Sequence, residues 1–555
     1  MNKILPLLKK DLRSFANLLR LVREESLFKI GFILMFAAAL LLGLWALFLE
    51  GFQFLDSLGG IGLMLVYRLF ALFFFGVGVM LVLSSVITSY TTFFRSEETA
   101  FLLLKPMTRS EVTVYKSLHA AVLASWAFFF TIIPFVGAYA WHEHLPIFFS
   151  VWTLLFSIPL VLLCSGIGSI VCLLVARWLP RVRWLVWPAL AALLIAGWRT
   201  WRRVVVSVGV EDETALMLNQ LIPGLRVASY PLWPSWWVSE GIMALTRGQW
   251  GRGLMFLGVL VSNMLMVGLV VHAMGRRLFY DGWQRAQYSR GATKRTGVLL
   301  RPLEQALGFL AADVRAMVLK DIRVFFRDVA QWSQGLVFFG LLALYFLNLR
   351  NLHYHVLPAE WRNLIAFLNV FSVSAVLCSF GSRFVYPQLS LEGHGFWVIG
   401  LSPTTMGRVL AAKFGLALTG MTLISAGLMA LSTRMLLVPP AIQAAAVCIA
   451  LAMSLGISGL STGLGAVFLD LKQTNPVAIV SGFGGTLNLA LSLLLMGLII
   501  VPFGVIFHLH YLGHLPGAEL PRGLAVAALW TAAVTAVATL VPLTLARRSL
   551  QRREY

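Results

Sequence analysis

The sequence contains two copies of one pattern of ionisable residues. These residues could act together chemically. The segment Lys10-Asp11-Leu12-Arg13-Ser14-Phe15 returns 310 positions later as Lys320-Asp321-Ile322-Arg323-Val324-Phe325. Both copies mix apolar and charged residues ahead of a hydrophobic run, which is typical of a helix lying at a membrane surface. Basic and acidic groups held there can form ion pairs with a neighbouring loop. Repetition over hundreds of residues also predicts a duplicated architecture.

A second repeated pattern supplies the neighbouring loop. Each copy contains acid, then an apolar patch, a proline and, ten residues after the proline, a lysine that opens the next apolar run. The second copy departs from the first, because one acid replaces an acidic pair and Gly393 and Gly395 flank His394. The first copy comprises Glu97, Glu98, Pro106 and Lys116, and the second comprises Glu392, Pro403 and Lys413.

The two patterns together predict ion pairs between amphipathic segment and loop. We expect Arg13 to pair with Glu97 or Glu98, and Arg323 to pair with Glu392. Exposed ion pairs contribute only about 0–1 kcal/mol, so their expected role is to move each helix with its loop. The alternative is that these charges only meet lipid headgroups or solvent. The amphipathic segments contribute Asp11, Arg13, Asp321 and Arg323 to this expected network.

The elements that must position these residues follow from composition. Hydrophobic residues make up 59% of the chain and charged residues 12%, whereas a soluble domain carries about 25% charged residues. Several runs of roughly 20 apolar residues can cross ~30 Å of hydrocarbon. The sequence therefore predicts an all-α, polytopic membrane protein with about 12 transmembrane helices in two parallel six-helix repeats. The expected spans are 30–49, 69–89, 118–140, 148–175, 184–198, 253–275, 333–349, 363–382, 412–433, 442–468, 477–507 and 523–545.

Charge predicts domain organisation and orientation. The first repeat is expected at 1–300 and the second at 301–555, each beginning with an amphipathic helix. Lys and Arg cluster at 1–29, at 276–332 and in the C-terminal tail, so the positive-inside rule places both termini in the cytoplasm. The net charge of +21 is then explained by orientation and by anionic lipids at the inner face, with no nucleic-acid partner.

The chain lacks the usual signatures of a driven or catalytic site. No Asp or Glu lies in the middle of an expected span, although ion-coupled carriers usually keep an ionisable group there. The sequence contains no GxxxxGK[ST], HExxH or CxxC pattern. No metal site is expected from the outer-loop histidines, because no cysteine or supporting pattern accompanies them. We therefore expect no enzyme and no cofactor in this chain, with driving energy supplied by another polypeptide.

The order of the repeated motifs resembles the ABC-2 type exporter permeases. The order of acid, apolar patch, L-x-P-x-T and a lysine before a span resembles the loop between the second and third spans of that family. The resemblance covers nearly the whole chain, as two fused six-span units of a bacterial inner-membrane permease. It implies outward movement of an amphiphilic or hydrophobic substrate, powered by a separate ABC ATPase subunit in two copies that holds ATP and Mg.

The same resemblance implies roles for individual residues. Glu97, Glu98, Pro106, Glu392 and Pro403 would lie on coupling loops seated on the ATPase. The family forms its cavity mainly from the second and fifth spans of each half, and three of these spans carry uncharged polar residues. Hydroxyl groups at helix interfaces also serve packing alone. The expected pathway residues are Ser84, Ser85, Thr88, Ser372, Ser374, Ser379, Ser481, Thr486 and Asn488.

Two other functions remain open from the sequence. An ion-coupled secondary transporter could bind Na⁺ through backbone carbonyls without a buried acid. A membrane-embedded lipid-modifying enzyme would typically need an acidic or histidine cluster at the membrane surface. The only outer acidic run is Glu211-Asp212-Glu213, which a solvated loop explains more simply. Co-purification of an ATPase would favour the exporter permease, and transport driven by an ion gradient would favour the ion-coupled transporter.

Overall fold

The structure is a computed structural model in which the described residues are almost entirely helical. It describes residues 6–7, 9–11, 13–14, 17, 27–57, 60–206, 230–291, 304–327, 359–436, 440–473, 476–511, 514, 516–517 and 519–552. Long apolar runs make this outcome necessary, because a backbone in hydrocarbon must satisfy its hydrogen bonds within the segment. The described part of the chain contains no β-strand.

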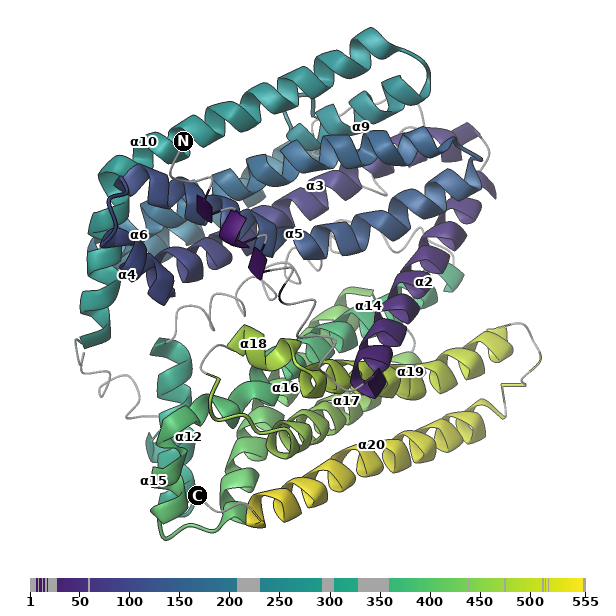
Figure 1. The fold of residues 1–555 in the computed structure, drawn as a ribbon. Helices are drawn as coiled ribbons and strands as arrows, with labels where there is room; N and C mark the ends of the chain where they lie inside the picture. Colours follow the sequence, from purple (N-terminus) through teal and green to yellow (C-terminus); the bar gives the residue numbers. More distant parts are fainter. Residues whose placement is uncertain are drawn as a thin grey trace. The chain divides into compact units, whose positions relative to one another are not determined.

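The chain divides into two compact units, Met1–Lys294 and Arg295–Tyr555, which we describe separately (Figure 1). Unit 1 contains α2 (Leu27–Ser57), α3 (Gly60–Tyr90), η1 (Thr91–Arg95), α4 (Glu97–Leu103), α5 (Arg109–His142), α6 (Ile147–Val206), α9 (Pro234–Thr246) and α10 (Trp250–Gly291). Unit 2 contains α12 (Ala312–Arg327), α14 (Ala359–Phe380), η3 (Gly381–Val385), η4 (Tyr386–Gln388), η5 (Ser390–Gly395), α15 (Phe396–Leu401), α16 (Met406–Leu436), α17 (Pro440–Val467), α18 (Pro476–Ser481), α19 (Phe483–Tyr511) and α20 (Leu520–Gln551).

Ten helices of the described residues are long and apolar enough to cross a membrane. The chain is therefore a multi-pass helical membrane protein, as its composition predicts. The span expected at 184–198 is not a separate helix, because α6 continues through it from Ile147 to Val206. The span expected at 333–349 lies outside the described residues.

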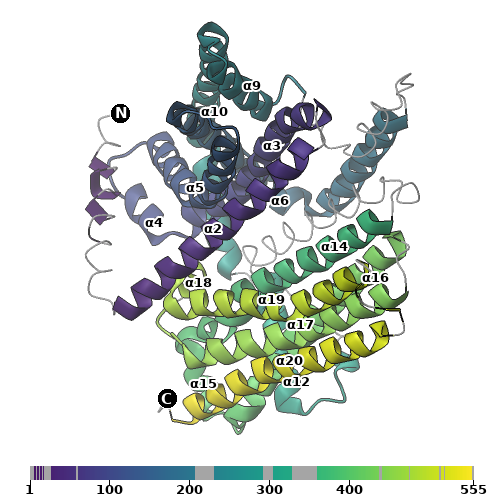
Figure 2. The ribbon, with the colours of Figure 1, turned by 90° about the vertical axis from the view of Figure 1, so that its right-hand side faces the viewer.

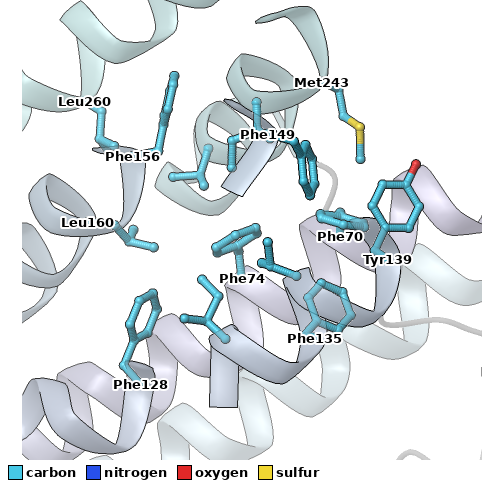
Figure 3. Packing of buried hydrophobic residues seen from close by; sticks show 14 of the residues in the cluster. Phe70, Phe74, Phe128, Phe135, Tyr139, Phe149, Phe156, Leu160, Met243 and Leu260 are labelled. Carbon is cyan, nitrogen blue, oxygen red and sulfur yellow. The ribbon is translucent and has the colours of Figure 1, made fainter. Parts of the chain in front are cut away.

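The interior of unit 1 is built from aromatic side chains. Phe70, Phe135 and Tyr139 come from α3 and α5, and ring centroids lie 4.8 Å apart for Phe70–Phe135 and 4.7 Å apart for Phe70–Tyr139. Phe74, Phe149 and further rings surround them in Figure 3. Tilted aromatic pairs contribute about 0.5–1.5 kcal/mol beyond the area that they bury. These contacts fix α3 against α5, and so position the loop between them.

The interior of unit 2 is mainly aliphatic, and α17 meets α20 through small residues. In Figure 2, α14, α19, α17 and α20 run alongside one another. Gly459 and Gly463 of α17 face Thr539 and Pro542 of α20 so closely that a Cβ atom at Gly463 would lie 2.6 Å from the Pro542 carbonyl carbon. Small residues spaced four apart allow such backbone contact between membrane helices.

This contact predicts a specific glycine effect. Gly463→Ala should destabilise the protein by about 1–3 kcal/mol, because the added methyl group meets backbone atoms that cannot rotate away. Gly497→Ala on α19 is the matched control, since a Cβ there meets nothing within 4 Å. Thermal unfolding in detergent measures both variants. Equal stability of the two would contradict the close approach of α17 and α20.

Candidate functional site

In unit 1, a carboxylate joins three segments that are distant in sequence. Glu98 on α4 forms ion pairs with Lys10 of the N-terminal segment and with Lys116 on α5, the latter at 2.6 Å. The Lys116 side chain is only 1% exposed. The Tyr115 hydroxyl donates its proton to Asp11 at 3.0 Å and also lies 3.3 Å from Glu98. We call these five residues the unit 1 charged cluster.

In unit 2, the equivalent residue types form an equivalent cluster. Glu392 on η5 pairs with Lys320 on α12 at 2.5 Å and with Lys413 on α16 at 2.6 Å. Lys413 also lies 2.8 Å from Asp321, and its side chain is 2% exposed. These four residues are the unit 2 charged cluster. In both units, therefore, a carboxylate on the loop binds one lysine of the amphipathic segment and one buried lysine of the following helix.

The two clusters differ in how the aspartate is used. In unit 1, Asp11 contacts Lys10 at 3.2 Å and accepts a hydrogen bond from the Tyr115 hydroxyl. In unit 2, Ala412 occupies the position before the buried lysine, and Asp321 contacts Lys413 directly. Lys413 consequently has two carboxylate partners, whereas Lys116 has one carboxylate and the Ser96 hydroxyl at 3.3 Å. The two units should therefore respond differently to loss of the glutamate.

Local backbone irregularities present both carboxylates. A π-helical turn ends the preceding membrane helix in each unit, η1 at Thr91–Arg95 and η3 at Gly381–Val385. Such turns are frequent at functional sites, because they shift the register of the helix. In unit 1 the Thr99 hydroxyl donates to the Thr92 carbonyl at 2.8 Å and fixes α4 to η1. In unit 2 Gly393 has φ of 55°, a conformation that favours glycine.

The start of α5 is specified by its sequence. Thr108 caps the helix by accepting from the Glu111 backbone N–H, and the Glu111 side chain accepts from the Thr108 N–H at 2.9 Å. This reciprocal capping box satisfies two N–H groups at the helix start. It fixes where α5 begins, and thereby places Lys116 opposite Glu98.

The structure gives the expected ion-pair residues different partners. Glu98 and Glu392 do join the loops to the amphipathic segments, but through Lys10 and Lys320. Arg13 is exposed, and the Arg323 Nε is buried without a hydrogen-bond partner among the described residues. Glu97 lies in the first turn of α4. Sequence reasoning noted the four lysines as repeats but did not assign them to the network. A lysine placed inside an apolar helix is the missed signal, because a buried cation needs a counter-charge.

The electrostatics of the unit 1 charged cluster favour ionised groups. Burial disfavours the carboxylate of Glu98, but hydrogen bonds from Lys10 and Lys116 outweigh this effect and lower its pKa from 4.5 to about 2. Burial also disfavours the charged form of Lys10, whereas its contacts with Glu98 and Asp11 raise its pKa above the ordinary value. Glu98 and Lys10 therefore both stay charged at neutral pH.

Low pH should weaken the ion pairs of the unit 1 charged cluster. A carboxylate whose pKa is lower in the folded state stabilises that state above its unfolded pKa, and this contribution disappears as pH falls. Wild type should therefore exceed Glu98→Gln in stability above about pH 4.5, and the gap should shrink as pH falls toward about 2. Thermal unfolding of both proteins across this range measures the gap. A gap independent of pH would contradict the ionised state of Glu98.

Each charged cluster is followed by an exposed apolar patch outside the membrane-spanning segments. After Glu98, Phe101 and Leu104 are 56% and 86% exposed. After Glu392, Trp397 and Leu401 are 58% and 78% exposed. The two leucines occupy the same position, two residues before Pro106 and Pro403. Paired apolar patches at equivalent places are suited to binding two equivalent partner surfaces.

The expected pathway residues lie in different surroundings in the described part of the chain. Ser85 is buried where α3 packs on Gly168 of α6. The Thr88 and Thr486 hydroxyls donate to carbonyls of their own helices. Asn488 is fully buried, and neither polar atom of its amide has a hydrogen-bond partner among the described residues. The remaining expected residues are Ser84, Ser372, Ser374, Ser379 and Ser481, and none of the nine lines the groove that the described part of unit 2 contains.

Comparison with known proteins gives one match. A family model described as "Putative ATP-binding cassette" matches residues 22–555. No curated protein and no solved structure matches the chain. The match therefore extends across both units, and includes both charged clusters except for the N-terminal residues Lys10 and Asp11.

This match corrects several expectations drawn from the sequence. The resemblance to ABC-2 type exporter permeases is wrong, because the matching family is a different one. The expected function, a permease subunit exporting an amphiphilic or hydrophobic substrate with a separate ATP-binding subunit, is contradicted for the same reason. So are the expectations that the chain is no enzyme and that ATP and Mg belong only to a partner, since the family description refers to ATP binding itself.

The described residues do not themselves fit a P-loop site for ATP. Such a site needs a strand, a glycine-rich turn whose N–H groups hold the phosphates, and a following helix. The described part of the chain is helical without strands, and the sequence lacks GxxxxGK[ST].

The description of the family and the membrane helices together point to an ABC transport system. Most of the chain is covered by the matching family model, including all ten candidate membrane spans. The chain belongs to the family described as "Putative ATP-binding cassette".

Proposed function

We propose that this chain is a membrane-embedded component of an ABC transporter, in which the two charged clusters transmit movement between an ATP-hydrolysing domain and the membrane helices. The observation that carries this proposal is the recurrence of one arrangement in both units. Glu98 and Glu392 each join an amphipathic segment to a buried lysine at the start of a membrane helix. An element that must move as one piece needs such a connection.

The proposed partner is an ABC ATPase subunit in two copies. Two equivalent apolar patches, each beside a charged cluster, support two equivalent contacts. Leu104 and Leu401 are the most exposed residues of these patches. Glu97, Pro106 and Pro403 would then shape the loops that receive the partner. Anionic lipids are the second proposed partner, because basic residues cluster beside the membrane helices.

The proposed arrangement in the membrane has two parallel six-span repeats. The repeated motifs support this arrangement, since equivalent charges precede equivalent helices. The bias of Lys and Arg supports cytoplasmic termini in a bacterial inner membrane. The charged clusters would then lie at the cytoplasmic surface, where an ATPase domain can reach them. Substrate movement along the uncharged polar residues of the membrane helices remains part of this proposal.

A charge placed in each apolar patch tests the proposed contact. Leu104→Asp combined with Leu401→Asp should reduce recovery of an ATPase with the tagged protein by more than tenfold, because a buried unpaired carboxylate opposes binding. Leu232→Asp is the control, since Leu232 is 71% exposed but lies far along the chain from either cluster. Recovery is quantified by mass spectrometry of material purified from native membranes. Unchanged recovery in the double variant would contradict the proposal.

A further inference from the structure

An apolar groove crosses unit 2 between α19 and α20. It encloses about 490 Å³, within the range of roughly 300–1,000 Å³ typical of ligand sites. Its floor includes Leu460 of α17, and its walls include Leu498 of α19 and Val537 of α20. The Trp530 indole N–H donates to the Leu498 carbonyl at 3.0 Å and ties the two walls together. The groove therefore presents hydrocarbon and no free polar group of these residues.

The α20 wall continues into a basic side chain. Trp530, Val537, Val541 and Arg548 are spaced by seven, four and seven residues, and at about 100° per residue they share one face of the helix. Arg548 is exposed and lies about 10 Å beyond Val541 along the axis. Arg547 is also exposed, but it points about 100° away from this face.

The position of Arg548 along unit 2 is fixed by packing. Ala546 and Leu550 of α20 lie in one buried cluster with Leu389 and Val409. Leu389 directly precedes η5, and Val409 lies one turn before Lys413 on α16. Arg548 is therefore at the end of unit 2 that carries the charged cluster, where a membrane helix leaves hydrocarbon.

We propose that this face binds one anionic phospholipid, with an acyl chain in the groove and its phosphate at Arg548. The charge and the groove lie on one stripe of α20, which runs about 27 Å from Trp530 to Arg548 at 1.5 Å per residue. An acyl chain gains little by leaving bulk lipid for an apolar groove, because both are hydrocarbon. Selectivity must then come from the headgroup. A single basic residue near the membrane surface corresponds to about fivefold in affinity for an anionic lipid.

The proposal rests on the proposed function in one respect, because it gives the anionic-lipid partner a site, and it does not depend on ATP coupling. Its test is native mass spectrometry of the full chain in detergent, titrated with phosphatidylglycerol and with phosphatidylcholine of identical acyl chains. The first phosphatidylglycerol bound should be held about fivefold more tightly than the first phosphatidylcholine. Arg548→Gln should abolish this preference, whereas Arg547→Gln should keep it.

A second pair of variants tests the groove itself. Ala533→Phe places a ring in the groove from an exposed position on α20 and should weaken binding of both lipids. Ala532→Phe, exposed on another face of the same helix, should not. Equal affinity for the two lipids in wild type, equal loss in Arg547→Gln and Arg548→Gln, or a dimer that excludes lipid from this face would overturn the proposal. If Ala533→Phe fails to fold, Arg547→Gln and Arg548→Gln still test the proposal, because both side chains are exposed.

Discussion

Removing the Glu98 carboxylate should be among the most damaging single changes in this protein. Lys116 is 1% exposed, and Glu98 is its carboxylate partner at 2.6 Å. Glu98→Ala leaves this cation buried beside the Ser96 hydroxyl. Breaking a buried ion pair by removing one partner costs about 3–5 kcal/mol, because the remaining charge is no longer compensated. We expect a loss of this size in the free energy of unfolding.

Three comparisons make the Glu98 result specific. Glu392→Ala should cost less, because Lys413 keeps Asp321 at 2.8 Å. Glu98→Ala with Lys116→Met should recover most of the stability, since replacing both members of a buried pair by apolar groups is often neutral. Arg13→Ala should change stability by less than about 0.5 kcal/mol, as expected of an exposed side chain. Chemical denaturation in detergent measures all four. A double variant no more stable than Glu98→Ala would refute the pairing with Lys116.

The repeat and the membrane class could be predicted from the sequence because both depend on long-range patterns. Apolar runs long enough to span a membrane must form helices, because the backbone in hydrocarbon has to satisfy its own hydrogen bonds. The repeated acids also predicted which segments meet, because Glu98 and Glu392 do connect loop to amphipathic segment. The pattern could not show which basic residue pairs with each glutamate. Lys10 and Arg13 are three residues apart, so they share one side of a helix, and only the position of the loop selects Lys10.

Two features of the fold could not be predicted from the sequence, for physical reasons. Helix α6 runs without interruption from Ile147 to Val206, although Pro180 and Pro188 would be expected to interrupt a helix. The groove of unit 2 depends on the spacing between α19 and α20, which no local pattern specifies. Residue types alone do not distinguish a pathway residue from one that packs in the interior, and in the structure the Asn488 side chain is fully buried.

The family resemblance failed because its motifs are general. An acid, an apolar patch, a proline and a lysine beside a membrane helix each serve needs that many membrane proteins share. The acid neutralises a buried lysine, the proline ends a helix, and the apolar patch binds a surface or lipid. Such motifs therefore predict a local arrangement better than they predict a family. The two charged clusters illustrate this, since their geometry does not depend on which ATP-binding component they contact.

The largest functional effect should come from cutting the connection between α12 and η5. Lys320→Cys with Glu392→Cys removes the ion pair that joins them. Lys413 then keeps Asp321 at 2.8 Å, and α12 keeps a second ion pair to α16 through Asp313 and Arg408 at 3.2 Å. Folding should therefore survive. If this connection transmits movement, ATP turnover coupled to transport in the reconstituted native complex should fall by at least tenfold.

A short thiol-specific cross-linker between the two new cysteines should restore the lost coupling. The covalent bridge replaces the ion pair and again makes α12 and η5 move as one piece, which a purely stabilising role for the ion pair does not require. The four native cysteines are first replaced by alanine, and this background protein is the control for assembly and activity. Mass spectrometry verifies the bridge, and coupling is measured before and after reduction. Full coupling in the unbridged variant, or no recovery once the bridge has formed, would show that the unit 2 charged cluster is only structural.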